Sequence, residues 1–541
     1  MAPSEDRRAG RMAALGMPMT RRRLLGGTAA AGLALGAGNL LAACGGGSSS
    51  PTGAGSTAAS GAPRRGGRLR VGHVGAGKGE SFDPARGSSF IDASRYYNLY
   101  DPLVRVNPDF SVGPGLADAW QPNSDGTLWE IKLRPDVVWH NGKPFTADDV
   151  IFTMRLMGDP SHVGHASVAN VRLGELKKVD DLTLSVPLKG PSARFMDSWV
   201  QQNTVIVQDG TTSFANPVGT GPFQFVSFTQ GERSLCKRNP NYWEEGKPYA
   251  DEWEDISIDD NTARLNALLS GEIDMMSQLD FNQAKAHQAQ GDIQVIDAPS
   301  PAFQVMLMAV DLEPFKDERV RQALRLIPDR QALIDGALAG FGTLGNDLFG
   351  YGLPYYADDL PVREQDLEQA KSLLKAAGQE GLTVTLHTSD IVPGFVEVAT
   401  LFAEQAKGAG VTVNVKKESA AAYFDTALLY TKLDFAQSYW TTGSLSAWYE
   451  QALASDAVWN ETHWRDTSYD SLIRQAQGAI NEDEATDLWH QVQQIQYDHG
   501  GYIGWANQNI VDAASNNVGG IVPNPFFNLG AWNYRDVYLK S

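Results

Sequence analysis

The sequence contains very little cysteine. Only Cys44 and Cys236 occur among its 541 residues. Cys44 follows a small-residue segment that, as argued below, predicts its lipidation, and this leaves one other thiol. A single thiol forms neither an internal disulfide nor a cysteine zinc site. Disulfide-stapled scaffolds and cysteine-ligated zinc domains are therefore excluded.

The usual catalytic signatures are also missing. Neither a GxSxG nucleophile motif nor an HExxH zinc motif occurs. Residues 72–79 nearly match a phosphate-binding loop, but Gly79 stands where that motif needs Ser or Thr for Mg²⁺. Residues 340–345 match the dinucleotide fingerprint, yet they follow a predicted helix instead of a strand. The sequence therefore predicts no enzyme, no cofactor and no metal site.

Basic side chains are scarce relative to acidic ones. The formal net charge is −19, from 45 Lys and Arg against 64 Asp and Glu. The first 43 residues carry six Arg and two acidic residues, so the remainder has a net charge of −19 − 4 = −23. A strongly acidic body argues against nucleic acid as a partner. We interpret the acidity as an aid to solubility and not as a ligand site.

The N-terminus has the pattern of an export signal. Arg21 and Arg22 form a twin-arginine pair before a weakly apolar run at 24–41. Small residues then precede Cys44, as at the cleavage site of a lipoprotein. We predict a signal peptide at 1–43, diacylation of Cys44, and a flexible Gly/Ser/Ala tether at 44–66. The alternative is a retained membrane helix, for which the run is short and rich in glycine. The predicted location is the outer face of the cytoplasmic membrane, in the periplasm or at the cell surface, with a lipid anchor only.

The body reads as mixed α/β. Alternating apolar residues predict strands at 68–72, 129–133 and 182–186, and Thr146 with Asp149 predicts the start of a helix. The second half alternates strands and helices, and two long helices follow. These segments are 383–387, 394–407, 411–417, 420–430 and 435–440, followed by helices at 468–480 and 484–497.

Aromatic residues mark a candidate ligand site at the end of the strand 435–440. Tyr439 and Trp440 run into Thr442 and Ser444. Rigid rings beside hydroxyl groups suit a ligand cleft, because they offer a large contact area at low entropic cost. We expect Tyr439 and Trp440 to wall or stack on a ligand, and Thr442 and Ser444 to donate hydrogen bonds to it. Tyr100 and Phe303 are further candidates, whereas we assign Trp448, Trp459 and Trp464 to core packing.

Several motifs in one order resemble the extracellular solute-binding proteins of family 5, the dipeptide, oligopeptide and nickel type. The similarity extends from about Arg68 to the C-terminus. The matching segments are 116–120, 133–137, 145–150, 219–222, 238–243, 270–274, 314–317, 319–324 and 329–330.

The resemblance implies a two-lobed periplasmic-binding-protein-like fold (type II, cluster C-like) that closes around a ligand by hinge motion. The first lobe is expected at 67–300, with an extra inserted subdomain at about 100–190. The second lobe is expected at 301–514, and 515–541 would return to the first. The expected partners of this monomeric protein are a small-molecule or peptide ligand and an ABC permease with its ATPase subunits.

One position departs from the peptide-binding pattern. In those members an Asp shortly after the strand that resembles 435–440 pairs with the peptide's α-amine, and here that position is Thr442. A neutral side chain supplies no such salt bridge. The ligand therefore stays open between a peptide and a non-peptide solute such as an opine, a sugar derivative or a nickel chelate. A tethered hydrolase and a sensor built on the same fold remain alternatives.

Overall fold

A computed structural model of the chain describes residues 63–75, 77–87, 89–420, 422–425, 428–441, 443–457 and 459–540. The predicted signal peptide with Arg21 and Arg22, the predicted lipidation site Cys44, and Thr442 lie outside these residues. Within them, no helix has both the length and the apolar character that crossing a bilayer requires.

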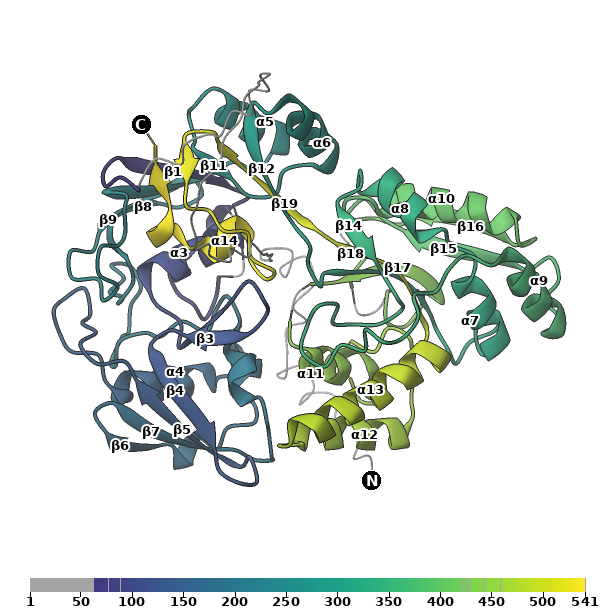
Figure 1. The fold of residues 1–541 in the computed structure, drawn as a ribbon, viewed down its shortest axis with the longest axis horizontal. Coiled ribbons are helices and arrows are strands. Elements are labelled where there is room, and N and C mark those ends of the chain that lie inside the picture. Colours follow the sequence, from purple (N-terminus) through teal and green to yellow (C-terminus); the bar gives the residue numbers. More distant parts are fainter. Residues whose placement is uncertain are drawn as a thin grey trace, which may run out of the picture.

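The chain forms two lobes, each built on a sheet with helices, as expected for a two-lobed α/β protein (Figure 1). The first lobe contains a seven-stranded sheet. At its centre β1 runs parallel to both β10 and β11, and its inner residues are buried. The strand order is β12, β19, β11, β1, β10, β9 and β8, with bounds Ile293–Ala298, Ile510–Ser515, Met275–Met276, Arg68–His73, Glu252–Ser257, Arg233–Arg238 and Phe223–Thr229.

A smaller four-stranded sheet lies within the range expected for the inserted subdomain. Its two central strands, β5 and β7, alternate buried residues with more exposed ones, so one face packs inward. The helix α4 (Ala147–Met157) begins at the capping box of Thr146 and Asp149. The strand order is β4, β5, β7 and β6, with bounds Ala117–Pro122, Leu128–Leu133, Thr183–Pro187 and Lys177–Asp180.

The second lobe is organised around a six-stranded sheet in which every residue of β13 and β17 is buried. The strand order is β14, β18, β13, β17, β15 and β16, with bounds Gly342–Leu344, Tyr502–Gln508, Phe303–Met308, Phe435–Trp440, Thr383–Thr388 and Thr412–Lys417. Its main helices are α7 (Glu318–Arg325), α8 (Arg330–Ala337), α9 (Leu367–Ala376), α10 (Phe395–Lys407), α12 (Thr467–Gly478) and α13 (Glu482–His499).

The helix predicted at 420–430 is wrong for the described residues of that segment, which form turns. The physical reason is the placement of Tyr423. Its ring is fully buried, and its hydroxyl group donates to the carbonyl oxygens of His387 and Gln437 at 3.0 and 2.8 Å. These hydrogen bonds attach the segment to two neighbouring strands, and they hold its backbone in turns instead of a helix.

Two connections join the lobes side by side. The chain passes from β12 to β13 through residues 299–302, and it returns from β18 to β19 through Asn509. The return therefore begins at Ile510, earlier than the boundary expected at 515. The side chain of Asn509 donates to Asp297 Oδ1 of β12 at 2.8 Å, and the backbone N–H of Gln508 donates to the carbonyl of Ala302 at 2.7 Å, so the two crossings are bonded to each other. A hinge motion between the lobes would take place at these two adjacent connections.

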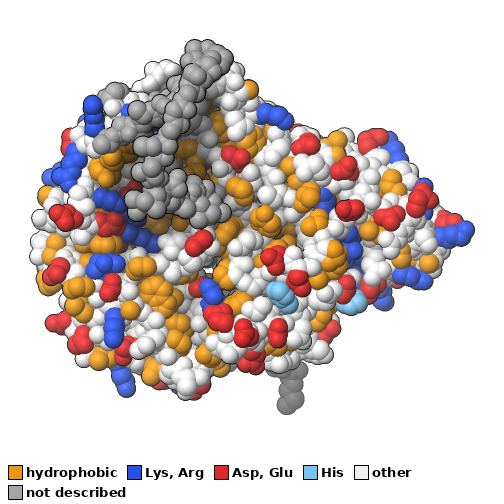
Figure 2. Space-filling view, in the orientation of Figure 1, with side chains coloured by type: hydrophobic (Ala, Val, Ile, Leu, Met, Phe, Trp, Pro, Cys, Tyr) orange, Lys and Arg blue, Asp and Glu red, His pale blue; other side chains and the backbone are white. Residues whose placement is uncertain are grey.

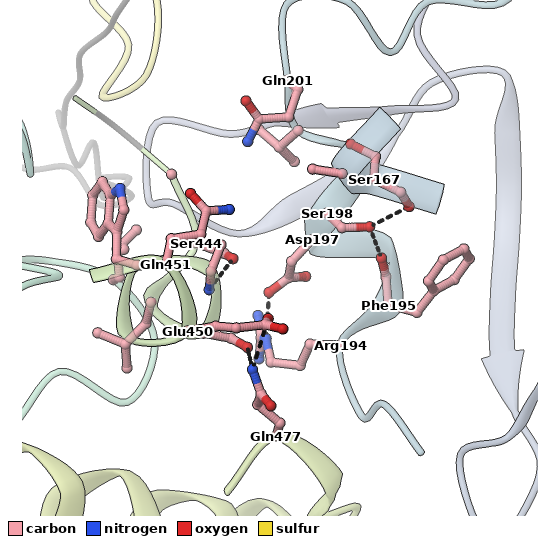
Figure 3. Close-up of a pocket in the computed structure, with 18 of the residues that line it drawn as sticks. Ser167, Arg194, Phe195, Asp197, Ser198, Gln201, Ser444, Glu450, Gln451 and Gln477 are labelled. Atoms are coloured by element: carbon pink, nitrogen blue, oxygen red, sulfur yellow. Dashed lines mark hydrogen bonds and ion pairs between the residues drawn. The ribbon is translucent and has the colours of Figure 1, made fainter. Parts of the chain in front are cut away.

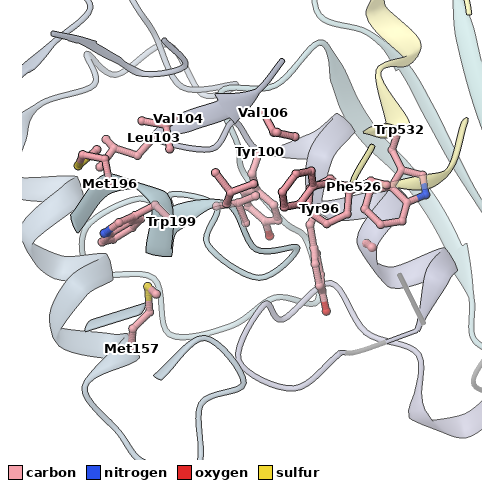
Figure 4. Packing of buried hydrophobic residues seen from close by; sticks show 14 of the residues in the cluster. Tyr96, Tyr100, Leu103, Val104, Val106, Met157, Met196, Trp199, Phe526 and Trp532 are labelled. Carbon is pink, nitrogen blue, oxygen red and sulfur yellow. The ribbon is translucent and has the colours of Figure 1, made fainter. Parts of the chain in front are cut away.

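The C-terminal segment completes the core of the first lobe. Figure 4 shows Tyr100 between Trp199 on one side and Phe526 and Trp532 on the other. Tyr100 ends α3 (Phe90–Leu99), is 1% exposed, and donates its hydroxyl hydrogen to the carbonyl of Phe82 at 3.2 Å. The structure thus uses this tyrosine for packing and not for the surface of a cleft.

Candidate functional site

A cavity of about 750 Å³ lies between the two lobes. Most residues between 190 and 203 of the first lobe line one side, and most residues between 439 and 451 of the second lobe line the other. The C-terminal Phe526 and Phe527 add to the wall. Figure 3 shows side chains from both sides pointing into the same space. A solute held there contacts both lobes at once, which is the geometry that hinge closure requires.

The predicted aromatic pair is at this cavity. Tyr439 and Trp440 end β17 and both line the wall. Their orientation is fixed from behind, because Tyr439 packs on Phe424 and Trp440 packs edge-on against Phe349, with ring centroids 5.5 and 5.3 Å apart. The rings therefore present rigid apolar surface, as aromatic walls of ligand sites do.

Trp440 is also held by a buried carboxylate. Its Nε1 donates to Glu461 Oε1 at 2.8 Å, and the hydroxyl group of Ser438 donates to Oε2 at the same distance. Glu461 is completely buried. The indole N–H is therefore committed to the protein, and Trp440 offers a ligand its ring and not its donor.

Ser444 lines the cavity and caps the short helix α11 (Leu445–Trp448). Its Oγ accepts a hydrogen bond from the backbone N–H of Ala447 at 3.2 Å. The cap uses an acceptor site of the hydroxyl group, so the hydroxyl hydrogen is left to donate.

Phe303 does not line the cavity. It is fully buried, pairs with Trp440 across β13 and β17, and packs against Phe349. Conversely, Trp448 and Trp459, which the sequence assigned to packing, do line the cavity while also contacting other rings. Trp464 packs on Tyr469. A bulky ring next to a cleft serves as both core and wall, which is why composition alone does not separate the two roles.

Sequence reasoning missed the first-lobe side of the site. Arg194 Nε donates to Asp197 Oδ2 at 2.5 Å, and both side chains line the cavity. Burial raises the pKa of Asp197, and the charge of Arg194 opposes this rise. Arg194 immediately precedes the short 3₁₀ turn Phe195–Trp199, which contains Asp197 and has no periodic pattern. The one sequence signal is a Gly-Pro-Ser turn at 190–192 just before it.

The second lobe contributes a carboxylate of its own. Glu450 lies in a π-helical turn, Tyr449–Leu453, and faces the cavity together with Gln451. Gln477 of α12 donates to Glu450 Oε2 at 3.2 Å and to Ser446 Oγ at 3.0 Å. Figure 3 shows Glu450 and Asp197 approaching from opposite sides. π-Helical turns occur often at functional sites.

The lobes touch beside these groups. Arg194 Nη1 lies 3.9 Å from Glu482 Oε1, and its guanidinium carbon lies 5.2 Å from the ring centroid of Tyr355. The backbone N–H of Ala193 donates to the carbonyl of Gln477 at 3.4 Å. Figure 2 shows acidic side chains gathered at the lower centre of this face, where α12 and α13 approach the first lobe. This contact lies at the mouth of the cavity, away from the hinge.

The described part of the chain holds no group of three His, Cys, Asp or Glu side chains placed for a metal ion. A serine–histidine–aspartate chain does exist, with His73 Nδ1 3.0 Å from Ser277 Oγ and its Nε2 3.3 Å from Asp255 Oδ1. All three side chains are buried in the first lobe, where a substrate has no access.

Residues 111–458 match the family of bacterial extracellular solute-binding proteins, family 5 Middle. The chain belongs to this family. The expected family and its two-lobed fold are thereby confirmed, and the chain is an extracellular solute-binding protein.

Curated relatives match nearly the whole of this family 5 member. It is 25% identical over 468 residues to the glutathione-binding protein GsiB of Pectobacterium atrosepticum, covering 83% of this chain and 91% of that protein. It is 25% identical over 506 residues to the dipeptide-binding protein of Escherichia coli, covering 86% and 93%. The crystal structure of the ABC transporter substrate-binding protein CtaP of Listeria monocytogenes superposes with a TM-score of 0.78 at 23% identity, covering 88% and 100%.

Proposed function

We propose that this family 5 protein captures a peptide in the cavity between its lobes and delivers it to an ABC permease. The observation that carries the proposal is the cavity of about 750 Å³, which residues of both lobes line. Ligand sites of this kind measure roughly 300–1,000 Å³ and combine apolar walls with a few placed polar groups. A short peptide fits both the volume and the composition.

The roles of individual residues follow from their positions. Tyr439 and Trp440 wall the apolar part of the ligand. Ser444 donates its hydroxyl hydrogen to the ligand. Thr442, which follows the end of the same strand in the sequence, is proposed to donate to the ligand as well. An extended peptide has unpaired backbone N–H and C=O groups, which can form hydrogen bonds with the backbone at the end of a strand such as β17. The names of the glutathione-binding and dipeptide-binding relatives support a peptide-like ligand.

The N-terminus supports delivery at a membrane. Export directed by Arg21 and Arg22 and diacylation of Cys44 would hold a monomer on the outer face of the cytoplasmic membrane. Two acyl chains anchor a protein durably, whereas one does not. The tether at 44–66 would let the lobes reach the permease.

A thermal-shift screen of the purified protein tests the proposal. Di- to pentapeptides, opines, oligosaccharides and nickel–histidine are compared. A ligand at 100 times its dissociation constant adds about 2.7 kcal/mol to the free energy of unfolding. We expect a peptide to raise the melting temperature and Trp440→Phe to reduce the shift.

A non-peptide solute is the second candidate, because Thr442 stands where peptide-binding members have Asp. If only an opine, a sugar derivative or a nickel chelate stabilises the protein, the assignment of a peptide as the ligand is wrong, whereas the proposal of solute capture stands. If a compound is consumed instead of retained, the binding protein reading fails and a hydrolase is indicated.

A further inference from the structure

Two glutamine side chains enter the cavity from opposite lobes. Gln201 follows the 3₁₀ turn Phe195–Trp199 of the first lobe, and Gln451 lies in the π-helical turn Tyr449–Leu453 of the second. Both line the cavity, and both are half-buried. Figure 3 shows their amide groups on opposite sides of the same space. A solute in the cavity therefore meets one neutral amide from each lobe.

The backbone of each glutamine is fixed, whereas its amide group is unengaged. The Gln201 carbonyl accepts from the Tyr97 hydroxyl group and from the Thr204 N–H, each at 3.2 Å. The Gln451 carbonyl accepts from the Trp459 N–H at 3.0 Å. Neither side-chain amide has a hydrogen-bond partner within the described part of the chain. An amide carries one acceptor oxygen and two donor hydrogens, so both kinds of site are open to a solute from either lobe.

The charged groups of the described cavity lining balance one another. They are two arginines and two acids, namely Arg194, Asp197, Glu450 and Arg474. The described lining therefore has no net formal charge, whereas the chain as a whole carries −19. Such a lining does not concentrate solutes of one sign. The placed neutral polar groups then contribute to the choice of solute.

We propose that Gln201 and Gln451 bind backbone amide groups of the solute, one glutamine from each lobe. Peptide N–H and C=O groups match the acceptor and donor sites of a glutamine amide. Resting on the proposed function, this makes both glutamines specificity-determining residues. They favour a solute with amide linkages over one of the same shape with ester linkages, because an ester has no N–H to donate.

The placement of the two amides also links recognition to closure. Burying a peptide group without a hydrogen bond is costly, so a cavity that closes around a peptide needs partners for it. Gln201 and Gln451 supply such partners from different lobes. A peptide bound by both glutamines therefore favours the arrangement in which the lobes are close together.

Isothermal titration with trialanine and its two ester analogues tests the assignment. In each analogue an ester oxygen replaces one backbone N–H, which removes a donor and nearly preserves the shape. The full chain is compared with Gln201→Met and Gln451→Met, which keep the length of the side chain and lose its hydrogen-bonding groups. Gln288→Met is the matched control, because Gln288 is exposed on α6 (Phe281–Gln290) and lies outside the cavity.

The expected effects follow from the net value of a neutral hydrogen bond, which corresponds to about 2- to 13-fold in affinity. The wild type should bind trialanine more tightly than at least one ester analogue by about this factor. Each of Gln201→Met and Gln451→Met should weaken trialanine binding by a similar factor. At least one of them should reduce the preference for the amide over that ester to within twofold. Gln288→Met should bind all three compounds as the wild type does.

The outcomes separate this assignment from the proposed function. Trialanine affinity that neither cavity substitution changes would overturn the assignment, while peptide capture stands. The same holds if the variants weaken trialanine and both esters equally, because the glutamines would then act through packing. A lower melting temperature of the ligand-free variants would show that the fold uses the amides, which also overturns the assignment. If trialanine does not bind the wild type, peptide capture fails and the assignment fails with it.

Discussion

The indole Nε1 of Trp440 donates a 2.8 Å hydrogen bond to Oε1 of the fully buried Glu461. The hydroxyl groups of Ser438 and Tyr502 donate to the same carboxylate at 2.8 and 3.1 Å. A buried carboxylate is costly unless donors surround it. Here those donors come from β17 and β18, so the charge fixes the wall of the cavity to the sheet behind it.

Replacing Glu461 by Gln should therefore loosen this wall. The new amide nitrogen is itself a donor, so it would not accept from Trp440, Ser438 or Tyr502. At least one of these three donors would then be without an acceptor. We expect the free energy of unfolding to fall by about 1–3 kcal/mol. Urea denaturation measures this loss, and weaker peptide binding with altered tryptophan fluorescence reports displacement of Trp440. An unchanged denaturation midpoint would show that the carboxylate does not support the site.

The contact at the mouth of the cavity should contribute to closure. Glu482 lies near Arg194 and also accepts from the Tyr355 hydroxyl group at 2.5 Å. Glu482→Gln removes the charge of an exposed pair, worth roughly 0.2–1 kcal/mol. Because a ligand that spans both lobes favours the closed state, affinity should fall by up to about fivefold.

Asp483→Asn is the matched control for Glu482→Gln. Both residues lie in the first turn of α13 and both substitutions remove one negative charge there. Asp483 makes no ion pair among the described residues. Small-angle scattering should show the liganded Glu482→Gln protein to be less compact than the Asp483→Asn protein. Equal affinities in the two variants would mean that the helix terminus, and not the contact with Arg194, is responsible.

The aromatic wall was predictable from sequence, and the facing wall was not. Tyr439 and Trp440 end the buried strand β17, and a short apolar run beside turn residues indicates such a strand in the sequence. Arg194 and Asp197 lie in an irregular turn, and Arg194 meets Glu482 only through the relative placement of the lobes. Nothing local in the sequence encodes that meeting. Tyr100 shows the converse error, because a tyrosine suits a cleft and a core equally until its hydroxyl partner, the Phe82 carbonyl, is known.

The predicted lipid anchor can be tested directly. Cys44→Ala removes the only thiol that the signal pattern offers for acylation. We expect the variant to leave the membrane fraction, while peptide affinity stays unchanged because Cys44 precedes the lobes. Cell fractionation and metabolic labelling with palmitate provide the measurement. Retention of Cys44→Ala on the membrane would instead favour an uncleaved apolar helix.

His140 should make the free energy of unfolding sensitive to mild acid, because its ring is hydrogen-bonded to the backbone of the segment 219–222. His140 Nδ1 accepts from the Gly219 N–H at 3.1 Å, and Nε2–H donates to the Gly221 carbonyl at 3.0 Å. This geometry needs the neutral ring, and burial lowers the pKa of His140 to about 4.

The sign of the effect follows from proton linkage. Between pH 6.5 and 4 the unfolded chain protonates this histidine, whereas the folded chain does not, so acid favours unfolding. The contribution of neutral His140 to the free energy of unfolding is therefore fully present above pH 6.5 and is lost as the pH falls toward 4. Urea titrations across this range should show a shallower pH slope for His140→Asn, whose folded and unfolded states bind no proton at this position. A slope equal to that of the wild type would assign the acid sensitivity to other groups, among which buried His162, whose pKa burial also lowers to about 4, is the next to substitute.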